Sequence, residues 1–465
     1  AQARIAVSDK DGKAGALLEA VPASARGDAG YTFSRIQWLR RQDRVEEAAQ
    51  LMLSAPRDPE SIIDTNEWWV ERRLIARKLL DADNVQAAYR IARDSARPEK
   101  GNYRAEQPFT AGWIALRFLN DPATAMGHFA TIAQGGTRSP IALARAGYWQ
   151  GRAAEAMGRS DEARRHYETA SRYPTAYYGQ LARARLGRSD LAVRRPPELS
   201  DAQRLSLRQS DTVRALELLY ATGHRDLVIP FVADSGERTS EPGVLVLMAE
   251  TAARYDDARA MLLIGKSALE QGFTLDQYAF PGTGIPKVAS IGPEIDRSLI
   301  YSIARQESQF NQRTVSSAKA MGLMQVTPAA GRYIAKKFGV AFHEKKLLSD
   351  PVYNTQMGAA EISDLVKDYG GNYAMAFAAY NAGRGRVREW VQRYGDPRKG
   401  DIDPVDWVER IPFSETRNYV QRVMENMQVY RGRFGRGERL TIDADLRGKA
   451  GQNAAADDAA AAPTD

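Results

Sequence analysis

Apolar and polar residues alternate with a helical period along most of the first 280 residues of the chain. Alanine-rich stretches with one apolar face follow one another, and short breaks containing Asp, Gly, Asn or Pro separate them. Apolar positions that recur every three to four residues are typical of amphipathic helices, and the residues in the breaks end helices or form turns. The pattern predicts an all-α N-terminal part made of consecutive helices.

A weak internal repeat divides this helical part into similar pieces. Four short segments align on their last alanine, and these alanines are 40, 37 and 38 residues apart: Ala48, Ala88, Ala125 and Ala163. A predicted tryptophan-bearing helix precedes each segment, with Trp38, Trp69, Trp113 and Trp149. A small alanine lets two helices approach closely, and the large ring fills the space beside it. A repeat of this length predicts a stack of helical hairpins, an α-solenoid.

Two roles fit the four tryptophans of the repeat. Packing in the core between helices is the interpretation that we favour, and stacking against a ligand is the alternative. The solenoid itself indicates a scaffold or a binding surface, without indicating the partner.

Two breaks divide the remainder of the chain. The first is Arg194-Arg195-Pro196-Pro197, and the second holds two Pro and two Gly within residues 280–286, which is typical of a linker. We therefore predict four parts: a solenoid domain over 1–195, a helical linker domain over 196–285, a compact domain over 286–438 and a tail over 439–465. The tail is Ala- and Asp-rich from Gly451 onward and has no apolar face there, so we expect its end to be disordered.

Composition excludes several classes of protein and site. Hydrophobic residues make up 43% and charged residues 26% of the chain, as in soluble globular proteins, and no apolar stretch is long enough to predict a membrane-spanning helix. The absence of cysteine rules out thiol nucleophiles, disulfides and thiolate metal sites, and it fits an oxidising compartment. The four histidines are scattered, so we expect neither a histidine metal site nor a Ser-His-Asp triad.

The beginning of the chain and its charge bear on location and partner. The chain starts with Ala1 rather than methionine, as an exported protein does after removal of its signal peptide, although a shortened chain starts in the same way. The net charge is +7, and residues 286–438 alone hold 23 basic and 17 acidic residues. This excess favours an anionic polymer or surface as partner. Nucleic acid is one such polymer, but no groove-reading or base-stacking motif accompanies the charge, so we expect none to bind.

One glutamate lies on an apolar helix face at the start of the compact domain. Asp296 is placed as an N-cap, and Ile300, Ile303 and Glu307 follow at i, i+3 and i+7. A carboxylate on such a face is costly unless it is paired or protonated. Desolvation raises its pKa, which is what a general acid at neutral pH needs. From this helix alone, a core glutamate satisfied by a buried hydrogen bond is an equal alternative.

Three more motifs follow the Glu307-Ser308 pair in a fixed order. They are Gly-Leu-Met-Gln at 322–325, Ala-Tyr-Asn-Ala-Gly at 379–383, where Gly383 is expected to cap a helix, and Ile-Pro-Phe-x-Glu-Thr-Arg-x-Tyr-Val at 411–420. Together the four motifs resemble those of the soluble lytic murein transglycosylase family. Residues 147–182 also resemble the helical domain that precedes the catalytic domain in these enzymes. Four motifs in order are far more specific than any one of them.

The resemblance implies an N-terminal α-superhelix followed by a lysozyme-like, mainly α catalytic domain, and a periplasmic location. It implies that Glu307 is the acid/base, that peptidoglycan is the substrate and that no cofactor or metal is required. The residues expected to bind the substrate are Ser308, Ser316, Gly322, Met324, Gln325, Tyr380, Asn381, Glu409, Glu415 and Tyr419. Which of Glu409 and Glu415 faces the sugar is left open, and an ion pair on the surface or at a helix cap is the alternative for both.

The acidic residues also bear on the reaction. Most glycosidases use two carboxylates, but Asp350, Glu361 and Asp364 are each interpreted as helix-start or helix-surface residues, so no motif supplies a partner for Glu307. One carboxylate suffices when the C6 hydroxyl of N-acetylmuramic acid attacks its own C1. We therefore predict a lytic transglycosylase that cleaves the β-1,4 bond between N-acetylmuramic acid and N-acetylglucosamine and leaves 1,6-anhydro ends.

Three other functions fit parts of the pattern. A goose-type lysozyme would share the fold and the glutamate but use water, and the lack of a second carboxylate argues against it. A non-catalytic peptidoglycan-binding scaffold would not need Glu307, Gln325 and Tyr380 together. A nucleic-acid binder would need a recognition motif. Proteins of a cell-wall assembly are conceivable further partners that the sequence does not identify.

Overall fold

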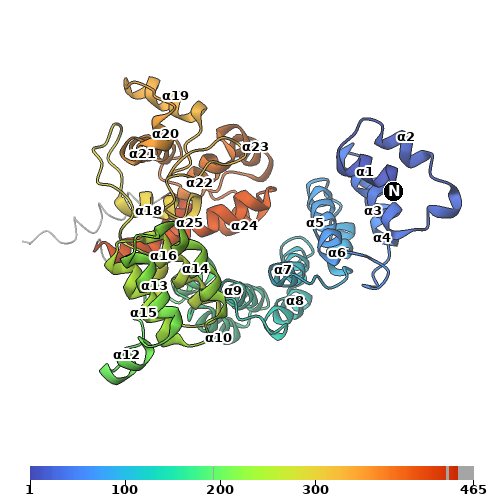
Figure 1. Cartoon of the computed structure of the whole chain (residues 1–465). Coiled ribbons are helices and arrows are strands. Elements are labelled where there is room, and N and C mark those ends of the chain that lie inside the picture. The colour runs from blue at the N-terminus through green and yellow to red at the C-terminus, as the bar shows by residue number, and fades with distance from the viewer. Residues whose placement is uncertain (192, 436–438, 449–465) are drawn as a thin grey trace, which may run out of the picture. The chain divides into compact units, whose positions relative to one another are not determined.

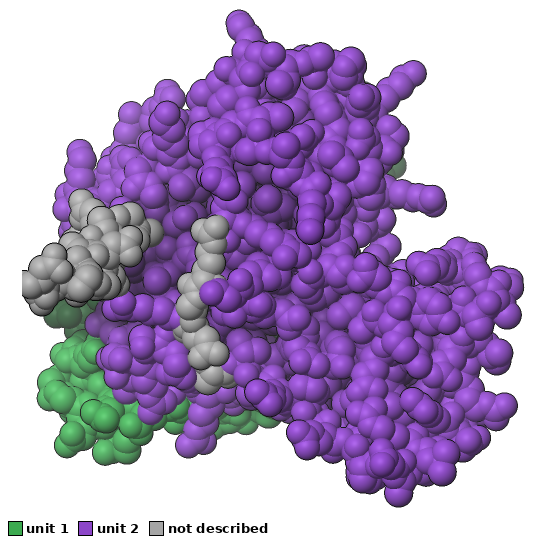
Figure 2. Space-filling view, turned by 90° about the vertical axis from the view of Figure 1, so that its left-hand side faces the viewer, with its two compact units in different colours: residues 1–138, 142–170 green, residues 139–141, 171–465 purple. Residues whose placement is uncertain are grey.

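The computed structural model describes residues 1–191, 193–435 and 439–448 (Figure 1). Within these residues the secondary structure consists of helices and a few isolated β-bridges, which confirms the predicted all-α class. Two compact units are distinguished: residues 1–138 with 142–170, and residues 139–141 with the chain from 171 onward (Figure 2). None of the described helices is both long and apolar enough to cross a membrane.

Unit 1 is a succession of helices, most of them paired in hairpins. Its elements are α1 (Gln2–Ser8), α2 (Ala14–Glu19), η1 (Ala23–Ala25), α3 (Ala29–Arg41), α4 (Val45–Ser54), α5 (Thr65–Asp81), α6 (Val85–Arg93), α7 (Gly101–Arg117), α8 (Pro122–Gln134), α9 (Pro140–Ala156, of which the first two residues count with unit 2) and α10 (Ser160–Ala170). The pairs α3–α4, α5–α6 and α7–α8 pack against each other. The predicted solenoid of helical hairpins is therefore confirmed.

The tryptophan and alanine repeat falls in register with these hairpins. Each tryptophan lies in the first helix of a pair and each aligned alanine in the second. Trp69, Trp113 and Trp149 are fully buried, which confirms the predicted core packing for these three, whereas Trp38 is half-buried. The hairpins pack so closely that a Cβ on Gly112 would lie 2.6 Å from the Phe129 ring of the paired helix. Small residues at these contacts are thus a steric requirement.

Unit 2 begins with helices that support the compact C-terminal part. They are α11 (Tyr177–Arg185), α12 (Asp201–Leu207), α13 (Asp211–Ala221), α14 (Arg225–Arg238), α15 (Pro242–Arg254), α16 (Ala258–Glu270) and α17 (Asp276–Ala279). Helices α13 to α16 enclose an apolar core of their own, which includes Leu216, Leu245 and Ile264. The predicted break at 194–197 is anchored, because Arg194 donates hydrogen bonds of 3.0 to 3.1 Å to the buried Asp276 carboxylate.

The C-terminal part of unit 2 is built around one long helix. Its elements are α18 (Arg297–Glu307), α19 (Pro328–Phe338), α20 (Lys346–Ser349), α21 (Pro351–Asp368), α22 (Tyr373–Ala382), α23 (Arg384–Tyr394), α24 (Pro404–Arg410), α25 (Ser414–Arg433) and α26 (Ile442–Arg447). Helix α25 packs against α11, α18, α22, α24 and α26. Gly383 ends α22 with φ +88°, so the predicted helix cap is confirmed.

The start of the predicted tail is part of this packing. Helix α26 buries Asp445, whose carboxylate accepts hydrogen bonds of 2.6 Å from both Gln428 and Arg431 of α25. The predicted disordered end, residues 451–465, lies outside the described residues. The predicted division of the chain into four parts stays a prediction.

Candidate active site

Helix α18 carries Glu307 as its last residue. Asp296 caps the other end, where its carboxylate accepts a hydrogen bond of 2.9 Å from the Ser298 N–H, so the predicted N-cap is confirmed. Ile300 and Ile303 are buried, and Glu307 continues their stripe but keeps part of its surface exposed. The helix packs against α25, and this contact fixes the position of the carboxyl group.

The surroundings of Glu307 favour its protonated form. Burial raises the pKa of the Glu307 carboxyl to about 7, the hydroxyl of Tyr419 works against this increase, and the negative charge of Glu415 adds to it. Although Tyr419 affects the pKa, its buried hydroxyl makes no hydrogen bond of normal geometry, and neither does the Glu307 carboxyl among the described residues. Because the Tyr419 hydroxyl lies beside the carboxyl and acts on its pKa, the alternative of a core glutamate held by a buried hydrogen bond stays open beside that of a general acid.

A second carboxyl group, that of Glu361 in α21, lies in the same site. It is half-buried and has no hydrogen bond or ion pair among the described residues. Burial raises the pKa of Glu361 to about 8, the positive charge of Arg384 lowers it, and the negative charges of Glu307 and Asp364 raise it. The interpretation of Glu361 as a helix-surface residue is wrong, because tertiary packing turns this face of α21 toward Glu307.

The position of Glu361 follows from the contacts of one stripe of α21. Asn354, Gly358 and Glu361 follow at i, i+4 and i+7, so they share one side of the helix. The Asn354 side chain accepts a hydrogen bond of 2.9 Å from the Met324 N–H and donates one of 2.7 Å to the Met321 carbonyl. A Cβ on Gly358 would lie 2.4 Å from the Cβ of Met324. The contacts of Asn354 and Gly358 hold α21 against the Gly-Leu-Met-Gln turn. Glu361 lies one helical turn after Gly358 on the same side of α21.

The other two acidic residues of this region are structural. Asp350 caps α21 and accepts hydrogen bonds of 3.0 Å from two backbone N–H groups of the first turn, as a helix-start residue should. Asp364 is buried and paired with Lys337 and, at 2.7 Å, with Arg384, so its interpretation as a surface residue is wrong. Of the three, Glu361 alone has a carboxyl without a partner among the described residues.

The Gly-Leu-Met-Gln motif forms a tight turn next to the two carboxyl groups. Isolated β-bridges join Met321 to Val315 and to Val326 at its base. Gly322 has φ +77°, and a Cβ there would lie 2.4 Å from the Asn354 side-chain nitrogen. Glycine is required at this position both for the left-handed backbone and for the close approach of α21. The location of Gly322 fits a role in shaping the turn.

Gln325 and Met324 tie this turn to its neighbours. Gln325 has a left-handed backbone, with φ +50°, and its amide nitrogen donates hydrogen bonds to the carbonyls of Thr314, at 3.0 Å, and Gly322, at 2.9 Å. Its amide oxygen is left as an acceptor. The Met324 side chain is fully buried, and its carbonyl accepts a hydrogen bond of 2.7 Å from the Tyr380 hydroxyl.

Two tyrosines complete a set of four side chains, Glu307, Glu361, Tyr380 and Tyr419, which we call the acid cluster. Burial and the charges of both glutamates hold the pKa of Tyr380 well above its usual value. The same causes, burial first and then Glu307, act on the pKa of Tyr419. Both phenols therefore stay protonated. The Tyr380 hydroxyl donates to the Met324 carbonyl and has lone pairs left as acceptors, whereas the Tyr419 hydroxyl can donate near the carboxyl groups.

Three further predicted site residues make hydrogen bonds that stabilise the fold. The Ser308 hydroxyl donates to a carbonyl one turn earlier in α18, at 3.2 Å. The Ser316 hydroxyl accepts a hydrogen bond of 3.0 Å from the Ala320 N–H. Asn381 accepts one of 2.6 Å from the Thr416 hydroxyl and so joins α22 to α25. Ser316 and Asn381 remain partly exposed, whereas Ser308 is buried.

The two glutamates that the sequence left open have different surroundings. Glu409 is 1% exposed, and its carboxylate accepts hydrogen bonds from the Tyr178 hydroxyl and from Gln421, at 2.6 Å, beside Arg417 at 3.7 Å. Glu415 is exposed in the first turn of α25, and its charge reaches Glu307. A partner can therefore contact Glu415 directly, while Glu409 joins α11, α24 and α25.

Glu361 is the residue that the sequence analysis missed. A signal was present, because the spacing from Asn354 through Gly358 to Glu361 marks one helix face. That face could be assigned to the site only when the contact of Asn354 and Gly358 with Met324 was known.

Two family models match consecutive parts of the chain. Residues 286–402 match the transglycosylase SLT domain, and residues 410–439 match the soluble lytic transglycosylase helical domain. A soluble lytic murein transglycosylase of Salmonella typhimurium is 38% identical over 155 residues, 33% of this chain and 23% of that protein. A membrane-bound lytic murein transglycosylase C of Mannheimia succiniciproducens is 37% identical over 155 residues, 30% of this chain and 43% of that protein.

Two solved structures share the fold over most of the chain. The lytic transglycosylase Slt of Pseudomonas aeruginosa, an inactive mutant, superposes with a TM-score of 0.66 at 22% identity, covering 94% of this chain and 71% of that one. The 70-kDa soluble lytic transglycosylase of Escherichia coli superposes with a TM-score of 0.50 at 22% identity, covering 93% and 76%. In sequence, the chain spans less than a quarter of the first curated relatives that it matches.

Proposed function

We propose, from the match of residues 286–402 to the transglycosylase SLT domain, that the chain is a lytic transglycosylase that cleaves the glycan strands of peptidoglycan in the periplasm. The observation that carries the proposal is the Glu307 carboxyl group, whose pKa burial raises to about 7. A carboxyl that keeps its proton near neutral pH can act as a general acid. The excess positive charge of residues 286–438 suits a polymer that carries peptide carboxylates.

In the proposed reaction Glu307 acts twice, first as a general acid and then as a general base. It first donates its proton to the glycosidic oxygen between N-acetylmuramic acid and N-acetylglucosamine, and the bond from that oxygen to C1 breaks. The C6 hydroxyl of the same muramic acid then attacks C1, and the Glu307 carboxylate takes the hydroxyl proton. The products are a 1,6-anhydro end and a free C4 hydroxyl. No water is consumed, and Glu307 ends protonated.

The neighbours of Glu307 would orient the sugar. The amide oxygen of Gln325 is an unused acceptor, and the nitrogen of that amide is held by the turn, so its direction is fixed. The hydroxyls of Ser316, Tyr380 and Tyr419 and the amide of Asn381 would contact the acetamido or lactyl groups. Glu415 would face the sugar as the exposed glutamate, with Glu409 positioning α25 behind it.

The first test removes the acid. Glu307→Gln keeps the size of the side chain but has no proton to donate, so digestion of purified peptidoglycan should slow by about 10² or more. The melting curve and circular dichroism of the variant serve as folding controls. Near-normal turnover by a folded Glu307→Gln variant would remove Glu307 from its proposed role.

The second test follows the product. Peptidoglycan is digested in oxygen-18 water, and the fragments are weighed by mass spectrometry. Intramolecular attack predicts muramic acid ends that are lighter than hydrolysed ends by one water and that carry no heavy oxygen. Heavy oxygen at most new ends would contradict the anhydro product, while the cleavage and the role of Glu307 would stand.

Hydrolysis of the same bond is a second candidate, and Glu361 is the observation that favours it. A hydrolase needs a group that holds and activates water, usually a second carboxylate. Glu361 is a carboxyl without a hydrogen bond or ion pair beside the acid, and because burial raises its pKa to about 8, it would activate water only when ionised at alkaline pH. If Glu361 activates water, digestion by wild type in oxygen-18 water should place heavy oxygen at the new ends. The Glu361→Gln variant should then show a larger loss of labelled ends than of total cleavage. An unlabelled product from wild type would exclude this role.

A further inference from the structure

A cavity of about 480 Å³ lies in unit 1, far from Glu307 in sequence. The end of α6, the loop that follows it, the first two turns of α7 and the last turns of α8 surround it. This volume is within the range of about 300 to 1,000 Å³ that is typical of sites for small ligands. No residue of the acid cluster lines it, so we call it the arginine cavity after the residues described next.

The walls of the arginine cavity carry positive charge only. Arg93, Arg97 and Arg104 line it together with His128, and neither aspartate nor glutamate does. His128 contacts the Tyr89 hydroxyl at 2.9 Å, and burial together with the charge of Arg93 lowers its pKa, so the ring is neutral at pH 7. The charge of the cavity at neutral pH therefore comes from its three arginines.

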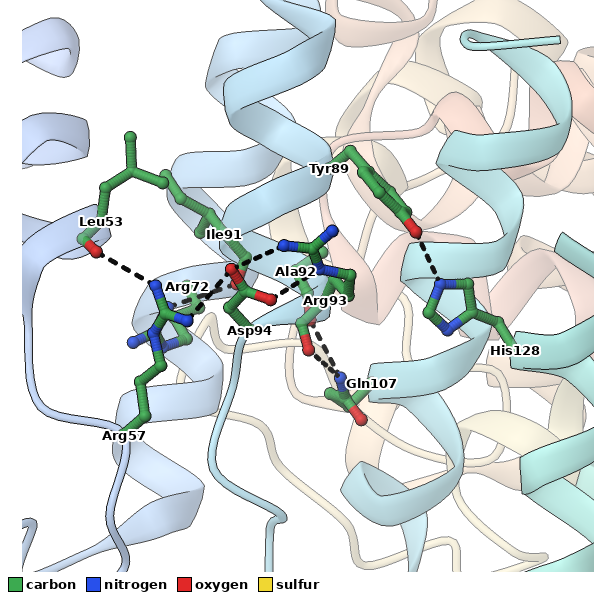
Figure 3. A network of polar contacts seen from close by, with 10 residues as sticks. All are labelled: Leu53, Arg57, Arg72, Tyr89, Ile91, Ala92, Arg93, Asp94, Gln107 and His128. Atoms are coloured by element: carbon green, nitrogen blue, oxygen red, sulfur yellow. Dashed lines mark hydrogen bonds and ion pairs between the residues drawn. The ribbon is translucent and has the colours of Figure 1, made fainter. Parts of the chain in front are cut away.

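Arg93 belongs to a group in which arginines outnumber acids (Figure 3). Asp94 accepts hydrogen bonds of 2.6 and 3.0 Å from Arg93 and pairs at 3.2 Å with Arg57. Behind them Arg72 is almost fully buried, one of its guanidinium nitrogens has no hydrogen-bond partner, and burial lowers its pKa to about 10. One carboxylate thus faces three guanidinium groups, and the excess charge adds to the field of the neighbouring cavity.

Arg97 and Arg104 have no acidic partner at all among the described residues. The Arg97 guanidinium lies near Gly135, at the end of α8, where it offsets the negative end of that helix dipole. Arg104 lies in the first turn of α7, close to Gly101, where the helix dipole is positive and no acidic residue or capping side chain compensates it. Two unpaired guanidinium groups therefore border the space.

Two uncharged polar side chains of the cavity are already in use. The Gln107 amide nitrogen donates to the carbonyls of Ala92 and Arg93, at 3.0 and 3.2 Å, and so closes the end of α6. The Thr131 hydroxyl donates to the His128 carbonyl at 2.8 Å. The donors left for a ligand are the guanidinium N–H groups, which recognise planar anions through two parallel hydrogen bonds, and the amide of the exposed Gln134.

We propose that the arginine cavity is a binding site for carboxylate groups of an acidic peptide. Its walls offer planar, charged donors and no acid, and its size suits a few residues of such a peptide. Resting on the proposed function, the peptide is a stem attached to the glycan strand, whose free carboxylates the site would hold during cleavage. The site would then contribute to binding the substrate without taking part in the chemistry.

The experiment measures binding to the full chain by titration calorimetry at pH 7 and low salt. The probes are an acidic tetrapeptide with free carboxylates, the same peptide with every carboxyl amidated, and inorganic phosphate. The test variant is Arg97→Gln/Arg104→Gln. The matched control is Arg90→Gln/Arg165→Gln, which removes the same charge from two exposed arginines of unit 1 outside the cavity.

Wild type should bind the acidic peptide more tightly than phosphate and should not bind the amidated peptide. The test variant should bind the acidic peptide at least about tenfold more weakly, because charge-assisted hydrogen bonds are lost, while the control pair binds like wild type. If the test variant and the control variant bind the acidic peptide equally weakly, the effect comes from net charge alone, and the proposed site is overturned. Binding of phosphate but not of the peptide would overturn the peptide as ligand.

Binding is read without cleavage, so the result does not depend on Glu307. If wild type fails to bind the acidic peptide but cleaves glycan, the arginine cavity proposal falls and the proposed function stands. If the peptide binds at the cavity but glycan is not cleaved, the proposed function falls and the carboxylate site stands.

Discussion

Glu307 and Glu361 are two partly buried carboxyl groups that form no ion pair among the described residues. Burying such a group costs free energy whenever it is ionised. Asp364, on the same helix as Glu361, shows the usual solution, because Lys337 and Arg384 pair with it. Carboxyl groups with such shifted pKa values are typical of functional sites. The free energy that it costs to ionise Glu307 in the folded protein leads to the next prediction.

Glu307→Gln should stabilise the protein at alkaline pH. The carboxyl ionises near pH 4.5 in the unfolded chain and near 7 in the folded one, so the folded state holds the proton longer and wild-type stability falls as pH rises through this window. Glutamine carries no charge and avoids this loss. Allowing for partial exposure, the variant should gain on the order of 2 kcal/mol at pH 8.

The measurement is urea unfolding of wild type and variant at pH 4 and pH 8. At pH 4 the difference should disappear, because the wild-type carboxyl is then protonated in both states. A variant that is no more stable than wild type at pH 8 would mean that the Glu307 carboxyl is well solvated. Glu361 titrates in the same range and is coupled to Glu307, so its variant should be compared separately.

At the scale of elements, the site depends on how α21 meets the Gly-Leu-Met-Gln turn. Asn354 holds this turn from one side, and the Tyr380 hydroxyl holds the Met324 carbonyl from another. The backbone is left-handed at Gly322 and at Gln325, which costs conformational energy at the non-glycine position. The turn is therefore kept in place by its partners, and Gly322 is where the contact is closest.

Gly322→Ala should damage both stability and activity. The new Cβ would lie 2.4 Å from the Asn354 nitrogen in a left-handed backbone, so the turn must move away from α21. Gly339→Ala is the matched control, since Gly339 also has a positive φ, +68°, but open space around it. The control should cost about 1–2 kcal/mol from the backbone alone, and Gly322→Ala clearly more, with a lower kcat.

Thermal melts and digestion rates of the two glycine variants provide the comparison. Equal losses of stability, with activity unchanged in Gly322→Ala, would show that the turn adjusts freely and that its contact with α21 does not hold the site.

The hairpins of unit 1 give a second prediction at this scale. Trp149 is fully buried among Phe109, Phe129 and Tyr148, so Trp149→Ala should leave a cavity and cost about 3–5 kcal/mol of the free energy of unfolding. Trp38→Ala is the control, and its cost should be smaller because Trp38 is half-buried. A Trp149→Ala variant that melts like wild type but no longer binds glycan would make this ring a ligand platform.

At the scale of the molecule, charge bears on how the chain meets its substrate. The positive excess of residues 286–438 should attract an anionic polymer at long range, and salt screens such attraction. Binding of Glu307→Gln to insoluble peptidoglycan should therefore weaken when NaCl rises from about 50 to about 500 mM. In wild type KM should rise with salt while kcat changes little. A salt-independent KM would leave the charge without a role in binding.

The sequence by itself determined the helices and their pairing, and it singled out Glu307 as the candidate acid. The helical period of apolar residues and the helix-capping residues are local properties, and they predicted α18 with its Asp296 cap. The spacing of alanine and tryptophan is also local, and it predicted the hairpins of unit 1. Glu307 could be singled out because its helix face and the motifs after it are both visible in the chain. Local preferences and short motifs survive folding unchanged, so these predictions needed no long-range contact.

Only the tertiary structure decided which other charges matter. Glu361 and Asp364 are three residues apart on one helix, yet the first is left without a partner beside Glu307 and the second is neutralised. Glu409 is enclosed by Tyr178 and Gln421, while Glu415 stays exposed. Arg97 and Arg104 face one cavity only because α7 and α8 meet there. Burial and charge depend on which distant segments pack together, and no local pattern encodes that.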